Sequence, residues 1–321
     1  MSEATRGLSE DAVRRRNAAR SGPDVPDEDD DDKSLASQVR DIEILARRLV
    51  NDAMAGQYHA VFKGRGMSFD SVREYAPGDD VRSIDWNVTA RTGEVFVKQF
   101  VEERELTVLL AVDLSGSQDF GTERKSKRKL AAEIAAVLAL SAISNNDRVG
   151  LILFTDRIER YIPPKKGRGH VLRVIQELLR FEPEGQGTRI DLACDYLSRI
   201  QRRRAVVFLL SDFLGPEYGR ALGVAARRHD LVPIVTTDQA EQSWPRFFPL
   251  LTLEDAESAE LLALDVGLGR NPQIYGERAH VARQRRSDEF RKNGLEPIEA
   301  MASRDYLKDL VAYFRRRAAR P

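Results

Sequence analysis

Five short side chains with hard oxygen atoms lie in three predicted loops of this sequence. They are two carboxylates and three hydroxyls: Asp113, Ser115, Ser117, Thr188 and Asp212. The first three follow the apolar run 106–112, and Asp212 follows the apolar run 206–210 with one residue between. In an open α/β sheet, ligands bind where the carboxyl ends of the strands and their loops converge. We therefore expect the five side chains to meet at one edge of a sheet.

This set of ligands favours a hard divalent cation. Oxygen ligands select Mg²⁺, Mn²⁺ or Ca²⁺ over softer metals, and Mg²⁺ suits a site that leaves several of its waters in place. Neutral hydroxyls leave the ion short of negative charge, so it would accept a carboxylate from outside. The pattern predicts Mg²⁺, or Mn²⁺, as a bridge to an Asp or Glu of a protein partner. In a competing interpretation, Ser115 and Ser117 only cap the next helix, and Asp212 is a turn residue.

Apolar strands alternate with amphipathic helices through the middle of the chain. Strands are predicted at 106–112, 149–154, 206–210 and 231–235. Helices are predicted at 128–143, 171–179, 192–200 and 218–228. This alternation predicts an α/β fold with a doubly wound (Rossmann-type), mostly parallel sheet covered by helices on both faces. Pro233 lacks a ladder donor, which indicates that the last strand lies towards an edge or is irregular there.

The flanks differ from this block in composition. Residues 1–34 form an acidic tail that is expected to be disordered, because it combines like charges with little apolar surface. Residues 35–105 are expected to hold a helix near 39–53 and then a β-rich segment. The α/β domain spans 106–240. Residues 241–321 are expected to hold returning strands at 247–253 and 261–266, which join the β-rich segment in a small domain, and helices at 274–291 and 304–317.

The overall charge balance limits the classes of partner. Lys and Arg number 51, as do Asp and Glu, so the net charge is zero, which argues against a general nucleic-acid or membrane-surface binder. Arginine clusters at 202–204, 283–286 and 315–317 have acidic residues nearby and are interpreted as solvated, salt-bridged faces. Cys194 is the only cysteine, so it forms no internal disulfide. With no run apolar enough to span a membrane and no secretion signal, a cytoplasmic location is expected.

Catalytic motifs are missing from the sequence. The four histidines show no metal-ligand spacing, and there is neither a phosphate-binding Gly-rich loop with Lys nor a Gly-x-Ser-x-Gly elbow. A Mg²⁺- or Mn²⁺-dependent phosphoester hydrolase with Asp113 as nucleophile is the alternative, although Ser115 stands where such chemistry usually has an acid. A scaffold whose site never holds metal is a third hypothesis.

A second group of motifs precedes the first strand. They combine Arg, Asp and Gly around aromatic residues: Gly64-Arg65-Gly66, Arg73-Glu74-Tyr75, Pro77-Gly78-Asp79-Asp80, Ile84-Asp85-Trp86, Ala90-Arg91-Thr92-Gly93 and Val97-Lys98. Their charged groups form either an internal hydrogen-bonded network that packs this segment against the α/β block or a docking surface for a partner.

These motifs resemble the bacterial family known as domain-of-unknown-function 58, over about residues 45–244. In order and loop context, Asp113, Ser115, Ser117, Thr188 and Asp212 resemble the metal-ion-dependent adhesion site of von Willebrand factor A domains. The resemblance implies a von Willebrand factor A-like fold with a flanking β-rich piece. It also implies a MoxR-type AAA+ ATPase as partner, in a system for chaperoning or assembly. We therefore expect a metal-dependent adaptor or co-chaperone and not an enzyme.

Overall fold

The computed structural model describes residues 40, 44, 61, 68–101, 105–119, 126–242, 250–254, 261–265 and 271–319. The predicted acidic tail at 1–34 lies outside the described residues. So does the predicted helix at 39–53, apart from Arg40 and Ile44, which are both helical.

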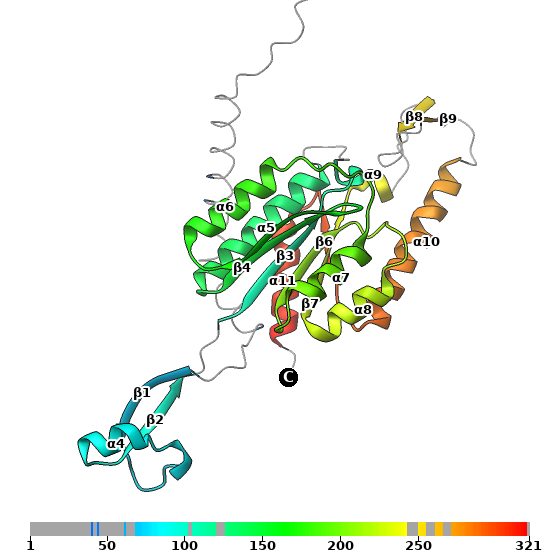
Figure 1. Ribbon diagram of the computed structural model, residues 1–321. Coiled ribbons are helices and arrows are strands. Elements are labelled where there is room, and N and C mark those ends of the chain that lie inside the picture. Colours follow the sequence, from blue (N-terminus) through cyan, green and yellow to red (C-terminus); the bar gives the residue numbers. More distant parts are fainter. Residues whose placement is uncertain are drawn as a thin grey trace, which may run out of the picture. The chain divides into compact units, whose positions relative to one another are not determined.

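A mixed sheet of six strands forms the centre of the fold (Figure 1). Its strands are β3 (Thr107–Asp113), β4 (Arg148–Phe154), β5 (Ile158–Lys165), β6 (Val206–Ser211), β7 (Asp230–Thr237) and β10 (Ile298–Met301). They lie in the order β10-β7-β6-β3-β4-β5, and only β5 runs antiparallel to its neighbour. The chain winds outwards from β3 in one direction through β4 and in the other through β6. The predicted α/β fold with a mostly parallel sheet is confirmed.

Helices cover the sheet because its strands are apolar on both faces. The long helices are α5 (Lys127–Ser144), α6 (Arg168–Arg180), α7 (Ile190–Ile200), α8 (Gly219–Arg228), α10 (Asn271–Lys292) and α11 (Tyr306–Ala318). Alternate strand residues such as Leu109 and Val207 pack in one core cluster with α7 and α8. The residues next to them in sequence, such as Leu110 and Phe208, point to the opposite face and are also fully buried. A second layer of helices therefore covers that face. None of the described helices is both long and apolar enough to cross a membrane.

Two strands of the sheet were not predicted, and one of them explains Pro233. Strand β5 contains Pro163 and Pro164 and has a mixed burial pattern, as an edge strand can. Strand β10 has four residues and pairs with β7 only from Ile234 onwards. Pro233 therefore lies just before this pairing begins, at a point where β7 has a partner strand on the β6 side alone. Strand β7 is thus second from the edge, but locally unpaired on one side at the proline.

The flanking segments form two small sheets of their own among the described residues. Strands β1 (Ser68–Glu74) and β2 (Phe96–Val101) pair antiparallel around the 3₁₀ turn η2 (Val81–Ser83) and helix α4 (Trp86–Thr92). Strands β8 (Leu250–Glu254) and β9 (Leu261–Asp265) pair antiparallel with each other. The predicted pairing of the two late strands is present. The division of the chain into domains stays a prediction.

Charged residues of the early motifs bond within the β1–β2 segment. Arg73 donates two hydrogen bonds to the Asp79 carboxylate, at 2.6 and 2.7 Å. Asp80 caps η2, and Asp85 caps α4 through the backbone N–H groups of Asn87 and Val88. These bonds agree with the predicted internal network within the β1–β2 segment. The predicted packing of this segment against the α/β block stays a prediction.

Gly150 offers a test of how tightly the sheet is packed. A Cβ at this position in β4 would lie 2.8 Å from a Leu109 methyl carbon and 2.9 Å from the Ile162 carbonyl oxygen. We expect Gly150→Ala to lower the free energy of unfolding by about 1–3 kcal/mol, since the clash includes backbone. Gly169→Ala, in α6, adds the same methyl group where no atom lies within 4 Å and should stabilise by about 0.5–1 kcal/mol. Urea denaturation gives the free energy of unfolding of both variants. Equal changes in the two variants would contradict close packing around Gly150.

Candidate functional site

The predicted site residues lie at the carboxyl ends of the two central strands. Asp113 is the last residue of β3, and Asp212 directly follows β6. Because the chain winds away in opposite directions from these neighbouring strands, the loops after them separate and leave room between them. The residues after Asp113 turn into the short 3₁₀ helix η3 (Gly116–Asp119), which keeps Ser115 and Ser117 beside the strand ends.

Asp113 is fully buried and held by two hydrogen bonds. Its Oδ1 accepts from the backbone N–H of Ser115 at 2.9 Å, and its Oδ2 accepts from the Ser211 hydroxyl at 2.6 Å. Burial, with the nearby negative charge of Asp212, raises the pKa of Asp113 to about 7. Two buried carboxylates in this position favour a positive charge between them.

The two serines connect Asp113 to Asp212. The Ser115 and Ser117 hydroxyl oxygens are 3.2 Å apart, and Ser117 donates to Asp212 Oδ2 at 2.8 Å. The other oxygen of Asp212, Oδ1, accepts from the backbone N–H of Leu214 at 3.1 Å. Four of the five predicted residues therefore form one continuous cluster of oxygen atoms.

Thr188 lies in the third loop, which contacts both of the others. The Gly116 N–H donates to the carbonyl oxygen of Gln186 at 2.8 Å, which joins this loop to the one after β3. On the other side, a Cβ placed on Gly215 would come within 3.1 Å of Thr188. Thr188 is buried, in a loop that contacts the loops after β3 and β6. Whether the five residues bind a metal stays a prediction.

A buried lysine, overlooked in the sequence, completes the cluster. The Nζ atom of Lys127 lies 2.8 Å from Asp212 Oδ2 and 2.5 Å from Glu241 Oε1. Glu241 belongs to the short helix α9 (Gln239–Gln242). Burial alone would lower the pKa of Lys127, but the Asp212 and Glu241 carboxylates raise it above its ordinary value. Lys127 begins α5, where the helix dipole disfavours a cation, so the two carboxylates must offset this effect as well as the burial. The helix was predicted from Arg128, one residue too late.

The backbone at Phe213 is strained and positions Asp212. Phe213 has φ of 58°, an unusual conformation for a bulky residue. Its ring packs edge-on against Tyr218 and Phe290, with centroids 5.8 and 4.9 Å away. Arg286, which is buried, donates from Nη1 to the Asp212 carbonyl oxygen at 3.0 Å. Strain of this kind persists only where surrounding contacts fix the turn, and it is typical of functional sites.

The donor set suits a hard divalent cation. If ionised, the carboxylates of Asp113, Asp212 and Glu241 exceed the Lys127 ammonium by two charges, which one divalent ion would balance. The described residues hold no group of three or more His, Cys, Asp or Glu side chains placed to bind a metal. The predicted site is of a different kind, since it would use two carboxylates with three hydroxyls. Asp113, Ser115, Ser117, Thr188 and Asp212 would hold the ion.

Removing the buried lysine tests this charge balance. Lys127→Met should lower the free energy of unfolding by about 3–5 kcal/mol in EDTA, because it leaves Asp212 buried without its counter-charge. Lys129→Met removes an exposed lysine two residues on in the same helix and should change it by less than about 0.5 kcal/mol. Chemical denaturation followed by circular dichroism gives both values. A Lys127 variant as stable as the Lys129 variant would show that the buried pairs contribute nothing.

Comparisons with known proteins identify the family and leave its activity open. An uncharacterized protein of Mycobacterium tuberculosis is 32% identical over 299 residues, which cover 91% of this chain and 93% of that protein. The crystal structure of the conserved hypothetical protein BatB from Bacteroides thetaiotaomicron matches 67% of this chain and all of that one, with 16% identity and a TM-score of 0.45. An aerotolerance-related membrane protein from Bacteroides fragilis matches 66% of this chain and 98% of its own, with 16% identity and a TM-score of 0.43. The model of the family described as "Protein of unknown function DUF58" matches residues 71–286, and the chain belongs to this family.

Proposed function

We propose that this DUF58 protein is a metal-dependent protein-binding module of the von Willebrand factor A type. Mg²⁺ or Mn²⁺ would be held by Asp113, Ser115, Ser117, Thr188 and Asp212, and would bind an Asp or Glu carboxylate of a partner. The observation that carries the proposal is the hydrogen bond from Ser117 to Asp212, at 2.8 Å, which joins the loops of two separate strands in one oxygen cluster. If the serines only capped a helix and Asp212 were only a turn residue, a hydrogen bond between their side chains would not be expected.

The strand order supports a ligand site at this place. Numbered along the chain within the sheet, the strands lie in the order 3-2-1-4-5-6, and the cluster lies at the ends of the first and fourth. In doubly wound sheets this is the point where the winding reverses and ligands bind.

Binding fits the cluster better than catalysis does. Asp113 is fully buried, so its carboxylate is not exposed to an incoming phosphoester. The Lys127 ammonium offsets part of the negative charge that a nuclease or phosphatase would use for a second metal. A Mg²⁺- or Mn²⁺-dependent hydrolase remains the alternative, and no observation favours it.

The family resemblance noted in the sequence supplies an expected partner. It points to a MoxR-type AAA+ ATPase, with this chain as adaptor or co-chaperone in the cytoplasm. The partner and the location are expectations from the sequence, and the oxygen cluster adds only the kind of bond the partner would make, a carboxylate to the ion.

Metal binding is the first test of the proposal. Isothermal titration calorimetry of the full chain with Mn²⁺ and with Mg²⁺ should show one binding site. Asp212→Asn should abolish binding, because it removes one of the two carboxylates of the site. Asp309→Asn changes an exposed acid on α11, outside the cluster, and should bind as the wild type does. Heat signals that are equal in the wild type and Asp212→Asn would place any bound metal elsewhere.

Partner capture is the second test. The MoxR-type ATPase of the same organism, purified, should bind the wild-type chain in Mg²⁺ and lose at least tenfold in affinity in EDTA, because the bridging ion is then absent. Asp113→Ala should behave in Mg²⁺ as the wild type does in EDTA. Affinity that is indifferent to chelation would exclude a metal bridge to this partner, and turnover of a generic phosphoester that Asp113→Asn abolishes would favour the hydrolase.

A further inference from the structure

Two exposed hydrophobic side chains face one groove beside the proposed metal site. Leu214, in the loop after β6, is 53% exposed, and Val281, on α10, is 62% exposed. Among the side chains described after residue 105, no other large hydrophobic residue is exposed. The groove between this loop and α10 has a volume of about 500 Å³, within the range of pockets that hold ligands. Exposed apolar residues that gather in one place mark an interaction site more often than scattered ones do.

The groove is continuous with the proposed metal site. Leu214 is two residues after Asp212, and its N–H donates to Asp212 Oδ1. Arg286 lines the groove and also donates to the Asp212 carbonyl oxygen. The strained backbone of Phe213 separates the two residues, and its ring is buried whereas the Leu214 side chain is exposed. One rigid turn therefore presents the Asp212 carboxylate to the ion and the Leu214 side chain to the groove.

The charges around the groove are mostly positive. Arg278, Val281, Ala282 and Arg285 lie on one face of α10, at the three- and four-residue spacing that aligns side chains. Two exposed guanidinium groups, those of Arg278 and Arg285, lie at the groove, against one lining carboxylate, Glu277. Arg286 is buried and pairs with Glu299 at 3.4 Å, so its charge is already balanced. This surplus complements an acidic partner and repels a basic one.

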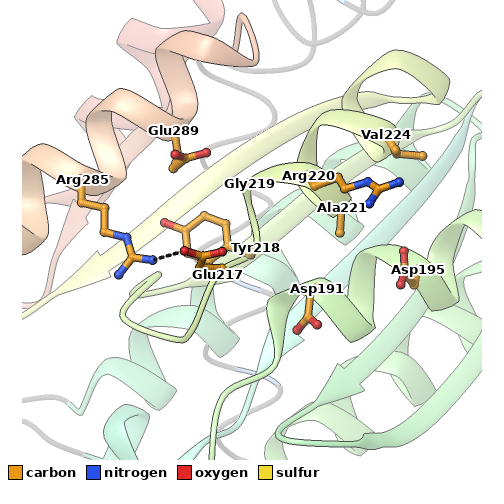
Figure 2. A pocket seen from close by; sticks show the side chains of 10 residues that line it. All are labelled: Asp191, Asp195, Glu217, Tyr218, Gly219, Arg220, Ala221, Val224, Arg285 and Glu289. Carbon is orange, nitrogen blue, oxygen red and sulfur yellow. Dashed lines mark ion pairs between the residues drawn. The ribbon is translucent and has the colours of Figure 1, made fainter.

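A second cavity, of opposite charge, limits the groove on one side. It has a volume of about 670 Å³ and shares Tyr218 and Arg285 with the groove. Figure 2 shows Asp191 and Asp195 on α7 and Glu217 and Glu289 around it, with Arg285 turned towards Glu217, 3.9 Å away. An acidic segment that leaves the metal site is therefore attracted along the groove but repelled beyond Arg285.

We propose that the groove binds a hydrophobic side chain from the same partner segment that gives its carboxylate to the ion. The recognised element is then an extended acidic peptide with an aliphatic residue a few positions from its Asp or Glu. This inference rests on the proposed metal-dependent function and adds the partner's sequence preference to it.

Synthetic peptides and paired variants test the proposal. Ten-residue peptides carry one central Asp and a Leu placed two, three, four or five positions away on either side, with Ser, Gly and Glu elsewhere. Matched peptides have Ser in place of Leu. Titrations into the ¹⁵N-labelled full chain, followed by amide shifts in Mg²⁺, give the affinities. The variants are Leu214→Ser with Val281→Ser, Asp212→Asn, and Val81→Ser as control, since Val81 is 61% exposed and belongs to the β1–β2 segment.

The wild type should bind at least one Leu peptide about tenfold more tightly than its Ser match, because the groove removes an aliphatic side chain from water. The double variant should lose that difference yet bind the Ser peptides as the wild type does. The Val81 variant should keep the difference in affinity between Leu and Ser peptides. Equal affinity of Leu and Ser peptides for the wild type, or a preference that survives in the double variant, overturns the groove proposal alone. Peptide binding that EDTA and Asp212→Asn leave unchanged, or no binding of any peptide, overturns the metal bridge as well.

Discussion

The Asp212 carboxylate, buried at the end of β6, is the group on which the arrangement of the surrounding loops depends. Its Oδ2 accepts from Ser117 and pairs with Lys127, and its Oδ1 accepts from the backbone of Leu214. A buried carboxylate is tolerated only where donors and counter-charges replace its lost water. Each of these donors comes from a different part of the chain. The loop after β3, the start of α5 and the turn into α8 are therefore fixed relative to one another by one side chain.

The same constraint explains why the cluster suits a cation. Asp113 is buried nearby, and its burial together with the negative charge of Asp212 raises its pKa. Lys127 supplies one positive charge, but it is shared with Glu241, so the cluster keeps a surplus of negative charge. Water cannot screen this surplus in a buried site. In the account proposed above, a divalent ion balances it and still has a coordination position for a partner's acid.

The central part of the fold could be predicted from the sequence because its signals are strong and local. The apolar runs that became β3, β4, β6 and β7 are nearly continuous, as strands buried on both faces must be. Asp113 and Asp212 could be placed together because parallel strands end at the same edge of the sheet. Strands β5 and β10 were missed, since edge strands carry prolines or polar residues and give no such run.

Other features depend on tertiary contacts that the sequence does not display. Lys127 resembles any surface lysine at a helix start until the fold brings Glu241 of α9 to its other side. The left-handed backbone at Phe213 goes with a ring that packs against Phe290, which is far away in the chain. The groove beside Leu214 exists only because α10 packs there, and its arginines appeared in the sequence as one more charged cluster.

The most direct test of the metal site is an anomalous diffraction map from crystals of the full chain grown with Mn²⁺. The account predicts a peak within coordination distance, about 2–2.5 Å, of the Ser115 and Ser117 hydroxyl oxygens and close to Asp113, Thr188 and Asp212. Lys127 should remain paired with Glu241. A map with full Mn²⁺ occupancy at another place and none among these five residues would contradict the central claim.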